Sequence, residues 1–549
     1  MRAAALVLIL LSGLSFGLGL GIPAITDSDE AYYAEASREM VERGDYLTPR
    51  FNYRERFQKP VLYYWATAAA YRAFGVREWT ARAGSALAGL GLVLLAFAAG
   101  RRWFDREVGL LAGAILATSF GAVFMARMAL PDLPLAFFIS ATVSTALVAL
   151  FDRPGHVSRW WAACGAAAGL GFLTKGPLAL ALPALVVAPP FLLERGWRHL
   201  RVRHAAVALA AFALLGLPWY AAMTAEHGSR YLSGFFLGDN LERFATTAYN
   251  PHRSPFFYVP ILLGGLLPWS PFLFLGLRPA RAAWRARRLS RHAVRLAAWS
   301  VLPLLFFSIS VGKQPRYILP VLPPIALALA VWIRNAVAGR GKVPGDQPVL
   351  ARWLSAACGA LVLALAALLW RAQPLLPDVA PGRRALGIAA LAAAGLAVIV
   401  LAATRRWRLA PAAVALSGAA IAVVLNQAVL AERGPYPVER MAQAVLRARQ
   451  AGEPVGPYRV FVRNLIFYTG VEQEDLYSEA RLRDFLDSPD RVLCVLGEND
   501  LRTLEAERPG RFRRLQSVSY FDPATAKLRA LLWPDPAREL RTVVLISNR

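Results

Sequence analysis

The chain has 549 residues, of which 56% are hydrophobic and only 18% are charged, and its mean hydropathy is +0.40. A soluble domain has about 45–50% apolar residues, so this composition excludes an ordinary soluble protein and predicts an integral membrane protein. The formal net charge of +26 would suggest a nucleic-acid partner in a soluble chain, but the basic residues of membrane proteins gather in cytoplasmic loops. Three widely spaced cysteines indicate neither a disulfide framework nor a cysteine metal site.

Apolar runs long enough to cross a bilayer occur along most of the chain. A hydrocarbon core of roughly 30 Å needs about 20 helical residues. About thirteen runs qualify as spans, near residues 3–22, 83–100, 108–126, 131–151, 160–174, 176–193, 205–224, 256–277, 296–311, 317–334, 353–370, 385–403 and 409–430. The first run lacks a convincing small-x-small cleavage site, so we expect it to be a retained anchor rather than a secretory signal.

The basic residues decide the orientation. Arginine-rich loops fall on one side of the thirteen-span map, at residues 101–106, 194–204, 278–295, 334–352 and 404–408. The positive-inside rule makes this side cytoplasmic. The N-terminus is therefore expected inside, and everything after Ala431 is expected outside.

The first outer loop, residues 23–82, combines acidic and aromatic residues. The stretch DEAYYAEASREMVERGDY has small and apolar residues at helical spacing, and Asp27 or Ser28 is placed to cap its first turn. The following FQKPVLYYWATAAAYRAF is rich in Tyr and Trp, which favour the headgroup level of a membrane. We expect a pair of helices that lie on the outer surface rather than cross the membrane.

The outer C-terminal segment, residues 432–549, differs in character from the transmembrane domain, residues 1–431. Runs typical of strands occur at Arg459–Val462, Val492–Leu496 and Thr542–Ile546, and charged helical runs at Glu479–Leu486 and Leu501–Arg508. This alternation predicts a small soluble α/β domain.

Carboxylates stand at the outer ends of two spans. Asp29 and Glu30 follow the first span, and Asp132 begins another in ARMALPDLPLAFF. A carboxylate near the membrane interface is costly unless it is capped, paired or functional. Helix capping remains an alternative to a functional role for both aspartates.

Five cations lie on the outer face, where the charge rule would leave few. They are Lys59, Lys175, Arg243, Lys313 and Arg316. Each alone is typical of an anchor that reaches toward the headgroups. Five on one face favour a site for the phosphate of a lipid.

These residues also carry a resemblance to a known family. DEAYYAEASREMVERGDYLTPRFNYRERFQKP is followed in order by ARMALPD, GFLTKGPLALALP, NLERF, PHRSPFFYVPILLGGLLPW and FSISVGKQPRYILPVLPPIAL. This assembly resembles the 4-amino-4-deoxy-L-arabinose lipid A transferases, bacterial relatives of the protein O-mannosyltransferases in the GT-C superfamily. The resemblance implies a mainly α, polytopic GT-C fold in the bacterial inner membrane, with juxtamembrane helices and the small C-terminal α/β domain in the periplasm.

The resemblance also implies an enzyme and its site. Family members move a sugar from a polyprenyl phosphate to a periplasmic acceptor, with inversion expected for in-line attack. Asp29 would be the reaction-centre acid, with Glu30 beside it and Asp132 as a second carboxylate. The donor lipid's site would comprise Lys59, Arg243, Tyr33 and Tyr317, with Lys175 and Lys313 as further cations. A sugar phosphate already has a good leaving group, so cations that stabilise the departing phosphate matter more than a general acid.

The chain departs from the aminoarabinose branch at three places. It has Gln58 where the branch has Glu, Asp239-Asn240 where the branch has Glu-His, and Tyr32 where the branch has Arg. The first two correspond to zinc-binding positions in the branch, so we expect no zinc and no other cofactor, with a loosely bound divalent cation left open. His252 alone is a poor metal ligand.

We therefore expect a sugar transfer from undecaprenyl phosphate, with aminoarabinose or a related sugar and lipid A or lipopolysaccharide as acceptor. A transfer like that of the protein O-mannosyltransferases, or to another glycan, is the alternative. A lipid flippase is the rival from another class, since it would also hold a headgroup with outer cations. No nucleic-acid partner is expected.

Overall fold

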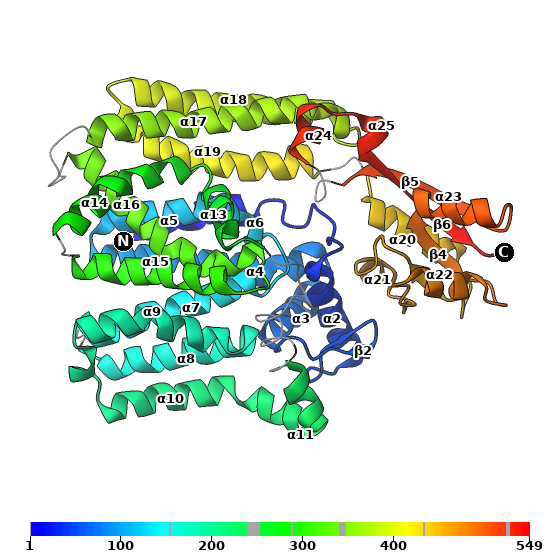
Figure 1. Ribbon diagram of the computed structural model, residues 1–549, viewed down its shortest axis with the longest axis horizontal. Helices are drawn as coiled ribbons and strands as arrows, with labels where there is room; N and C mark the ends of the chain where they lie inside the picture. The colour runs from blue at the N-terminus through cyan, green and yellow to red at the C-terminus, as the bar shows by residue number, and fades with distance from the viewer. Residues whose placement is uncertain are drawn as a thin grey trace.

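The computed structural model describes residues 2–152, 155–235, 238, 253–286, 289–339, 347–431, 434–522 and 527–549. Long helices lie side by side across most of Figure 1, and a small sheet with its own helices lies at the right end of that view. The chain is therefore a helical bundle followed by a separate α/β layer.

The described helices of the bundle follow one another along the chain from residue 2 to residue 429. Up to residue 232 they are α1 (Arg2–Ser12), η1 (Gly13–Gly17), α2 (Asp29–Arg43), α3 (Leu62–Phe74), α4 (Glu78–Trp103), α5 (Arg106–Thr118), α6 (Phe120–Ala126), α7 (Asp132–Leu147), η2 (Val148–Asp152), α8 (Val157–Lys175), α9 (Leu178–Leu193), η3 (Gly196–Arg198), α10 (Val202–Gly216) and α11 (Pro218–Leu232). From residue 255 to 429 they are η5 (Pro255–Phe257), α13 (Tyr258–Gly265), η6 (Ser270–Gly276), α14 (Leu277–Ala286), α15 (Arg291–Ile309), η7 (Pro315–Val321), α16 (Leu322–Ala338), α17 (Gln347–Arg371), η8 (Gln373–Leu375), α18 (Pro381–Ala403), η9 (Trp407–Leu409), α19 (Ala410–Val424) and η10 (Leu425–Val429).

Among the described residues, seven helices are long and apolar enough to cross a membrane, or up to ten if three bent helix pairs each form one span. The predicted count of about thirteen is not confirmed. The three remaining predicted runs correspond to α1, α8 and α9. The first and the last are shorter apolar helices, Arg2–Gly17 and Leu178–Leu193, and α9 contains three prolines. The multi-pass architecture itself is confirmed.

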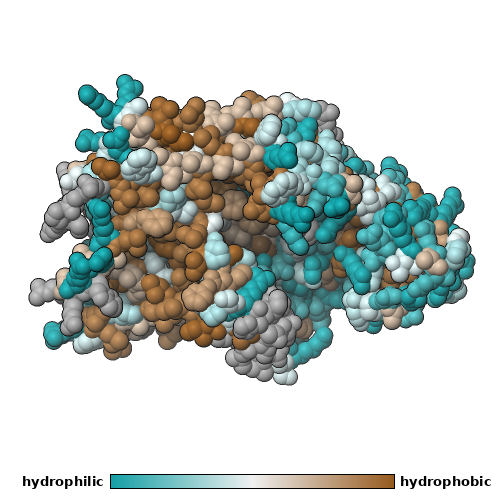
Figure 2. Space-filling view, turned by 45° about the horizontal axis from the view of Figure 1, so that its top comes forward, coloured by the Kyte–Doolittle hydropathy of each residue, from teal (hydrophilic) through white to brown (hydrophobic). Residues whose placement is uncertain are grey.

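The surface of the bundle matches a membrane protein. Figure 2 shows a broad hydrophobic band over the helices, with hydrophilic residues at the left edge and over the α/β part at the right. Large apolar side chains such as Leu209 on α10 and Leu386 on α18 are 66% and 72% exposed. Lipid tails are the environment that accepts such surfaces.

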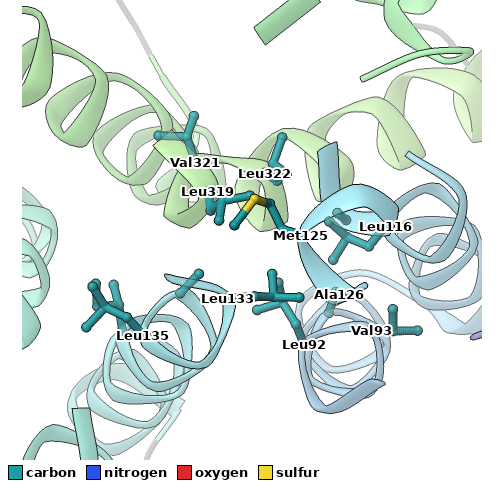
Figure 3. Close-up of a cluster of buried hydrophobic side chains, with 14 of the residues drawn as sticks. Leu92, Val93, Leu116, Met125, Ala126, Leu133, Leu135, Leu319, Val321 and Leu322 are labelled. Carbon is teal, nitrogen blue, oxygen red and sulfur yellow. The ribbon is translucent and has the colours of Figure 1, made fainter. Parts of the chain in front are cut away.

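The core of the bundle lies where helices from both halves of the chain meet. Leu92 from α4, Leu116 from α5 and Leu133 from α7 converge with Leu319 and Leu322 from the η7–α16 segment (Figure 3). All five side chains are buried. This packing fixes the start of α7 next to η7, and both segments carry residues of the candidate site.

The first outer loop forms the two predicted helices, α2 and α3, joined by a short hairpin of β1 (Arg50–Phe51) and β2 (Arg54–Glu55). The Ser28 side chain accepts a hydrogen bond from the backbone N–H of Glu30, so Ser28 is the N-cap and begins α2 at Asp29. Gly44 ends α2 with a φ of 71°, a conformation that favours glycine.

The α/β part contains β3 (Val455–Pro457), β4 (Leu493–Gly497), β5 (Arg513–Phe521) and β6 (Leu540–Ser547), in the order β3-β4-β6-β5. Among the strands that the structure describes in this sheet, only β3 and β4 pair in parallel. Its helices are α20 (Pro437–Ala448), α21 (Leu465–Thr469), α22 (Glu479–Leu486), α23 (Glu498–Glu507), α24 (Leu528–Leu532) and α25 (Pro536–Glu539). The predicted boundary after residue 431 stays a prediction, since residues 432–433 lie outside the described ranges.

Two of the three predicted strands are confirmed as β4 and β6, and both predicted helices as α22 and α23. The strand predicted at Arg459–Val462 is wrong. Arg459 and Phe461 have positive φ values of 62° and 55°, which no strand accepts. This segment is a turn that contacts the first outer loop.

Candidate active site

Two carboxylates and two cations meet where three segments begin and one ends. Asp29 is the first residue of α2, and Asp132 is the first residue of α7. Lys175 ends α8, and Arg316 lies at the start of η7. The sequence places these residues up to 287 positions apart, so the packing of the bundle alone brings them together.

Arg316 bridges the two acids. Its guanidinium forms an ion pair with Asp29, and its Nε lies 3.4 Å from Oδ1 of Asp132. The Lys175 ammonium lies 2.6 Å from the same Oδ1. Asp132 is thus held between two cations.

The two acids differ in access to solvent. The Asp29 side chain is 43% exposed, whereas that of Asp132 is 5% exposed. Asp29 is therefore the carboxylate that a substrate can approach. Asp132 is placed to hold Lys175 and Arg316 in position.

The turn after α8 positions Lys175. Gly176 has a φ of 81°, and a Cβ added there would lie 2.6 Å from the Phe235 ring. Only glycine fits this turn without strain. The Lys175 ammonium also lies 5.4 Å from the centre of the Tyr317 ring, so this predicted residue shares the site.

Lys59 and Tyr33 line the same region. Lys59 is buried and lies within electrostatic range of Asp132. The Tyr33 ring stacks on Tyr64 with centres 5.3 Å apart. Burial, followed by the nearby Tyr64, raises the pKa of Tyr33 well above 10, so its phenol remains protonated. Arg243 lies outside the described residues, and its predicted role stays a prediction.

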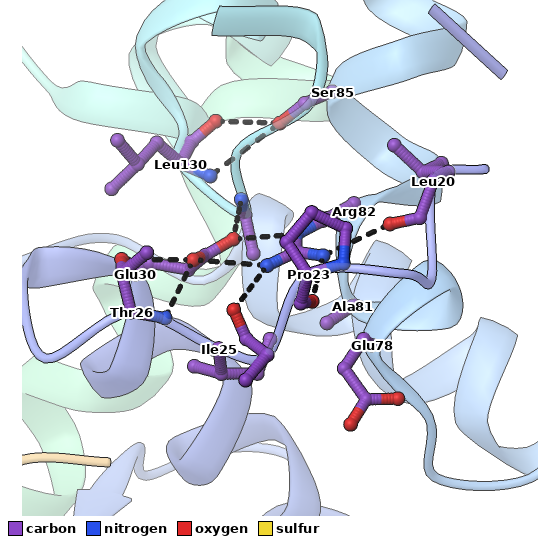
Figure 4. Close-up of polar contacts among 12 residues, drawn as sticks. Leu20, Pro23, Ile25, Thr26, Glu30, Glu78, Ala81, Arg82, Ser85 and Leu130 are labelled. Atoms are coloured by element: carbon purple, nitrogen blue, oxygen red, sulfur yellow. Dashed lines mark hydrogen bonds and ion pairs between the residues drawn. The ribbon is translucent and has the colours of Figure 1, made fainter. Parts of the chain in front are cut away.

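Glu30 forms a buried ion pair with Arg82 (Figure 4). Its Oε1 accepts from Arg82 Nε at 2.8 Å and from the Ala129 backbone N–H at 2.9 Å. Burial alone would raise the pKa of Glu30, but the Arg82 charge and these bonds lower it. This geometry supports a structural role, in which Glu30 connects α2, α4 and the turn before α7, and its predicted catalytic role stays untested.

Lys313 makes its hydrogen bonds to the backbone. Its ammonium donates to the backbone carbonyls of Ser310 and, at 3.2 Å, Arg253. The side chain is buried at 2% exposure. The sequence predicts both Lys313 and Arg316 for the lipid phosphate, and the structure brings Arg316, three positions later, to the carboxylates.

Two further arginines surround Tyr32. The Arg56 guanidinium lies 4.0 Å from the centre of the Tyr32 ring, and the Arg463 guanidinium lies 5.5 Å from it. Arg463 also donates to the Tyr32 hydroxyl at 3.1 Å. Sequence reasoning missed both arginines because neither lies in an apolar segment, and Arg463 comes from the α/β part. Tyr32, which stands where the aminoarabinose branch has Arg, is thus in contact with two guanidinium groups.

The α/β part contacts the first outer loop through several hydrogen bonds. The backbone N–H groups of Val462 and Arg463 donate to Asp27 at 3.2 and 2.7 Å. Asn464 donates to the Ile25 carbonyl at 2.8 Å. Asp27 is therefore not the helix cap; it holds the turn at residues 459–464 against the segment that begins α2.

No group of three or more possible metal-ligating side chains occurs in the described ranges. Gln58 has an amide where the aminoarabinose branch has a carboxylate, and it is exposed. An amide is a poor zinc ligand. Asp239, Asn240 and His252 are not among the described residues, so the expected absence of zinc stays a prediction.

Comparisons with known proteins define the class. A sequence model of the dolichyl-phosphate-mannose-protein mannosyltransferase family matches residues 24–229. The crystal structure of ArnT from Cupriavidus metallidurans bound to undecaprenyl phosphate superposes with a TM-score of 0.75 at 21% identity, covering 99% of this chain and 98% of that one. The protein therefore has the GT-C membrane fold of that structure.

The sequence relatives are more specific. The undecaprenyl phosphate-α-4-amino-4-deoxy-L-arabinose arabinosyl transferase of Erwinia tasmaniensis is 32% identical over 416 residues, which are 74% of this chain and 73% of that protein. The protein of the same name from Pseudomonas aeruginosa strain LESB58 is 39% identical over 338 residues, but the match spans only 58% of its length. The chain belongs to the family of undecaprenyl phosphate-α-4-amino-4-deoxy-L-arabinose arabinosyl transferases.

Proposed function

We propose that this protein is an inverting glycosyltransferase that moves 4-amino-4-deoxy-L-arabinose, or a related sugar, from undecaprenyl phosphate to lipid A or lipopolysaccharide. The observation that carries the proposal is the cluster in which Arg316 joins exposed Asp29 to buried Asp132 and Lys175. Family membership supports the donor, since the relatives carry that donor in their names.

The reaction breaks the bond between the anomeric carbon and a phosphate oxygen. The departing polyprenyl phosphate takes the bonding electrons and gains negative charge, which Lys175, Arg316 and Lys59 are placed to stabilise. Prearranged cations in a site with little water act strongly on such charge. The acceptor oxygen attacks from the opposite side and inverts the anomeric centre.

In this reaction, Asp29 is the residue that acts on the acceptor. Its carboxylate is half-exposed and is fixed by Arg316. It orients the acceptor and takes its proton when the attacking oxygen carries one, a contribution of about 10²–10⁴ in rate for a general base.

Envelope chemistry tests this function. Mass spectrometry of lipid A and of glycoproteins from cells with and without the chain is expected to show loss of an aminoarabinose-modified lipid A. Complementation by Glu42→Gln, an exposed carboxylate on the same helix, is expected to restore it, and Asp29→Asn is not. If every sugar-modified lipid and protein persists without the chain, the proposal is wrong.

A hexose transfer to a protein is the second candidate. The match of residues 24–229 to the mannosyltransferase family model favours it. Loss of a hexose from a glycoprotein in the same experiment, with lipid A unchanged, identifies this alternative. A flippase would instead move lipid across the bilayer without changing a glycosidic bond.

We also propose that the protein lies in the bacterial inner membrane with its N-terminus in the cytoplasm and its α/β part in the periplasm. The distribution of arginine-rich loops supports this orientation. Alkaline phosphatase fused after Arg549 is expected to be active, since that enzyme needs the periplasm. An inactive phosphatase fusion together with a fluorescent cytoplasmic reporter at the same position would reverse the orientation.

We further propose that the site works without zinc, because Gln58 removes a carboxylate ligand. Metal analysis of the purified chain is expected to find well below one zinc per molecule, and treatment with a zinc chelator is expected to leave turnover unchanged. Stoichiometric zinc whose removal stops turnover would contradict this.

A further inference from the structure

A charged cavity lies at the end of the bundle opposite the candidate active site. It has a volume of about 760 Å³ and is lined from the end of η2 to the start of α8 and from η3 to the start of α10. Lys175 ends α8 in the active site, and Val157 begins the same helix at this cavity. A helix of 19 residues spans roughly 28 Å, so the two sites are about one membrane thickness apart.

The lining of this cavity is basic. It includes Arg159, Arg198, Arg201 and Arg203, together with three histidines, and none of its described lining residues is acidic. None of the four arginines forms an ion pair with another described residue. Their charges are therefore uncompensated by the parts of the chain that the structure describes.

The acids nearest in sequence are used elsewhere. Asp152, at the end of η2, pairs with Arg102 on α4. Glu194, just before η3, pairs with Arg295 on α15 at 2.6 Å. The fold thus removes both carboxylates from the cavity and leaves its positive charge in place.

A buried ring forms one wall of the cavity. His204 is only 4% exposed and lines the cavity. Its Nδ1 is buried and has no hydrogen-bond partner among the described residues. A buried polar atom without a partner is costly, and a ligand atom in the cavity would satisfy it.

Two helices also begin at the cavity. The N-caps of α8 and α10, His156 and Arg201, make no side-chain capping hydrogen bond. Free backbone N–H groups at helix N-termini attract anions, and phosphate groups in particular. The arginines, the histidine and these helix ends therefore point to the same kind of ligand.

The surroundings of the cavity indicate that this ligand is a lipid. Val202 is 88% exposed and Leu193 is 70% exposed beside the arginines. Farther along α10, Leu214 is 74% exposed. Trp197, at 50% exposure, is a residue type that favours the headgroup level. The acyl chains of a lipid whose phosphate lies in the cavity could thus pack on the neighbouring apolar surface of the protein.

The close contact of α8 with α10 holds the cavity in shape. A Cβ added to Gly165 on α8 would overlap the Ala208 carbonyl oxygen of α10. Gly169 and Gly216 also meet across this interface. Small residues allow such contact between membrane helices, and the basic starts of both helices are consequently held side by side.

We propose that this cavity, lined by Arg159, Arg198, Arg201 and His204, is a binding site for the phosphate headgroup of an anionic membrane phospholipid, separate from the sugar-transfer site. Basic pockets between membrane helices bind such headgroups. The proposal does not depend on the sugar that the protein transfers.

Native mass spectrometry of the purified full chain tests the proposal. The chain is titrated with phosphatidylglycerol and with phosphatidylcholine of the same acyl chains. We expect phosphatidylglycerol to bind preferentially, and the triple variant Arg159→Gln/Arg198→Gln/Arg201→Gln to weaken its binding by about fivefold for each charge removed, or roughly 100-fold. His204→Leu, which removes the unpaired ring nitrogen, is expected to weaken binding in an otherwise normally charged protein.

The control is a triple variant with the same charge change, Arg278→Gln/Arg281→Gln/Arg285→Gln on exposed α14, which lies at the same left end of the bundle in Figure 1. We expect it to bind phosphatidylglycerol as the wild type does. Equal loss in both triple variants, or unchanged binding in the cavity variants, would overturn the proposal. Binding of inorganic phosphate as tight as that of phosphatidylglycerol, with displacement of the lipid, would overturn the lipid assignment in favour of a soluble phosphate.

Discussion

At the scale of single residues, the two aspartates of the site have different surroundings and different roles. Asp29 is accessible and Asp132 is buried between Lys175 and Arg316. An aspartate enclosed by two cations is suited to hold them for a phosphate, and an accessible one is suited to meet an acceptor. The same arrangement explains why the acids lie at the starts of helices, since an N-terminal turn stabilises negative charge.

Substitutions of Arg316 and Lys313 test which of these two predicted cations acts in the reaction. Arg316→Gln is expected to lower turnover by about 10²–10³, the usual effect of removing one prearranged electrostatic group. Lys313→Gln is expected to lower turnover far less, because its ammonium is bound to backbone carbonyls. The measurement is turnover per folded molecule, and a larger loss for Lys313→Gln would contradict the assignment.

Glu39, on α2, is expected to make the stability of the folded protein depend on pH. Burial, together with the nearby Glu35, raises the pKa of Glu39 to about 7. The folded protein then keeps a proton that the unfolded chain releases near pH 4.5. Because the folded state binds more protons, its free energy of unfolding falls as the pH rises from about 4.5 to about 7.

The Glu39→Gln variant is neutral at every pH and should lack this fall. Thermal unfolding between pH 5 and pH 7.5 is the measurement, and the difference in Tm between Glu39→Gln and the wild type should grow with pH. A constant difference across this range would show that Glu39 does not carry a raised pKa.

The sequence predicted several residues of the site because they belong to short motifs at the ends of apolar runs. Asp29, Asp132 and Lys175 were found in this way, and the structure brings them together. Arg316 and Lys313 share one motif, and only the direction of the 3₁₀ turn η7 distinguishes them. Arg463 was beyond prediction, since its contact with Tyr32 joins positions 431 residues apart.

At the scale of elements, the Glu30–Arg82 pair connects the first outer loop to the bundle. Arg82 also donates to the backbone carbonyls of Leu20, Pro23 and Ala24 (Figure 4). Both partners of the pair are almost fully buried. Breaking a buried pair leaves a charge without a partner, which is far more costly than losing a surface pair.

Glu30→Ala is therefore expected to lower the free energy of unfolding by about 3–5 kcal/mol. Glu42→Ala, at an exposed position on the same helix, is the control and should change it by less than about 1 kcal/mol. A double variant, Glu30→Leu/Arg82→Leu, should recover part of the loss. A Glu30→Ala protein of normal stability that lacks turnover would instead support the catalytic role predicted from the sequence.

The contact of α8 with α10 is a second feature of the elements. Gly165→Ala would place a methyl group against the Ala208 carbonyl, and overpacking of this kind costs about 1–3 kcal/mol. Gly382→Ala on α18 is the control, because a Cβ there meets nothing within 4 Å. Thermal unfolding in detergent measures both, and equal Tm values would contradict the close packing.

At the scale of the whole molecule, hydropathy predicted the membrane class and most of the helices. It did not predict which apolar runs are short or bent. The α5–α6, α10–α11 and η5–η6 regions bend by 61°, 47° and 110°, and such bends depend on packing against neighbours. The C-terminal turn at residues 459–464 resembles a strand in its apolar residues, but Phe461 packs in the hydrophobic core of the α/β part while the backbone makes a turn.

The parts of the molecule that form and surround the candidate active site lie at one end of the bundle. The candidate active site, the first outer loop and the α/β part lie together toward the right of Figure 1, and the basic loops around α9, α10 and α14 lie toward the left. This polarity matches a protein that receives a lipid-linked sugar on one side of a membrane and is anchored by basic loops on the other.

Transfer by the purified full chain in lipid nanodiscs tests the central claim most directly. The chain is supplied with undecaprenyl phosphate-linked aminoarabinose and lipid A, and mass spectrometry follows sugar-modified lipid A and released undecaprenyl phosphate together. We expect both products to form in equal amounts with the wild type and with Glu42→Gln, and to fall by about 10²–10⁴ with folded Asp29→Asn. Product formation by Asp29→Asn at the wild-type rate would contradict the role of Asp29 as the reacting carboxylate.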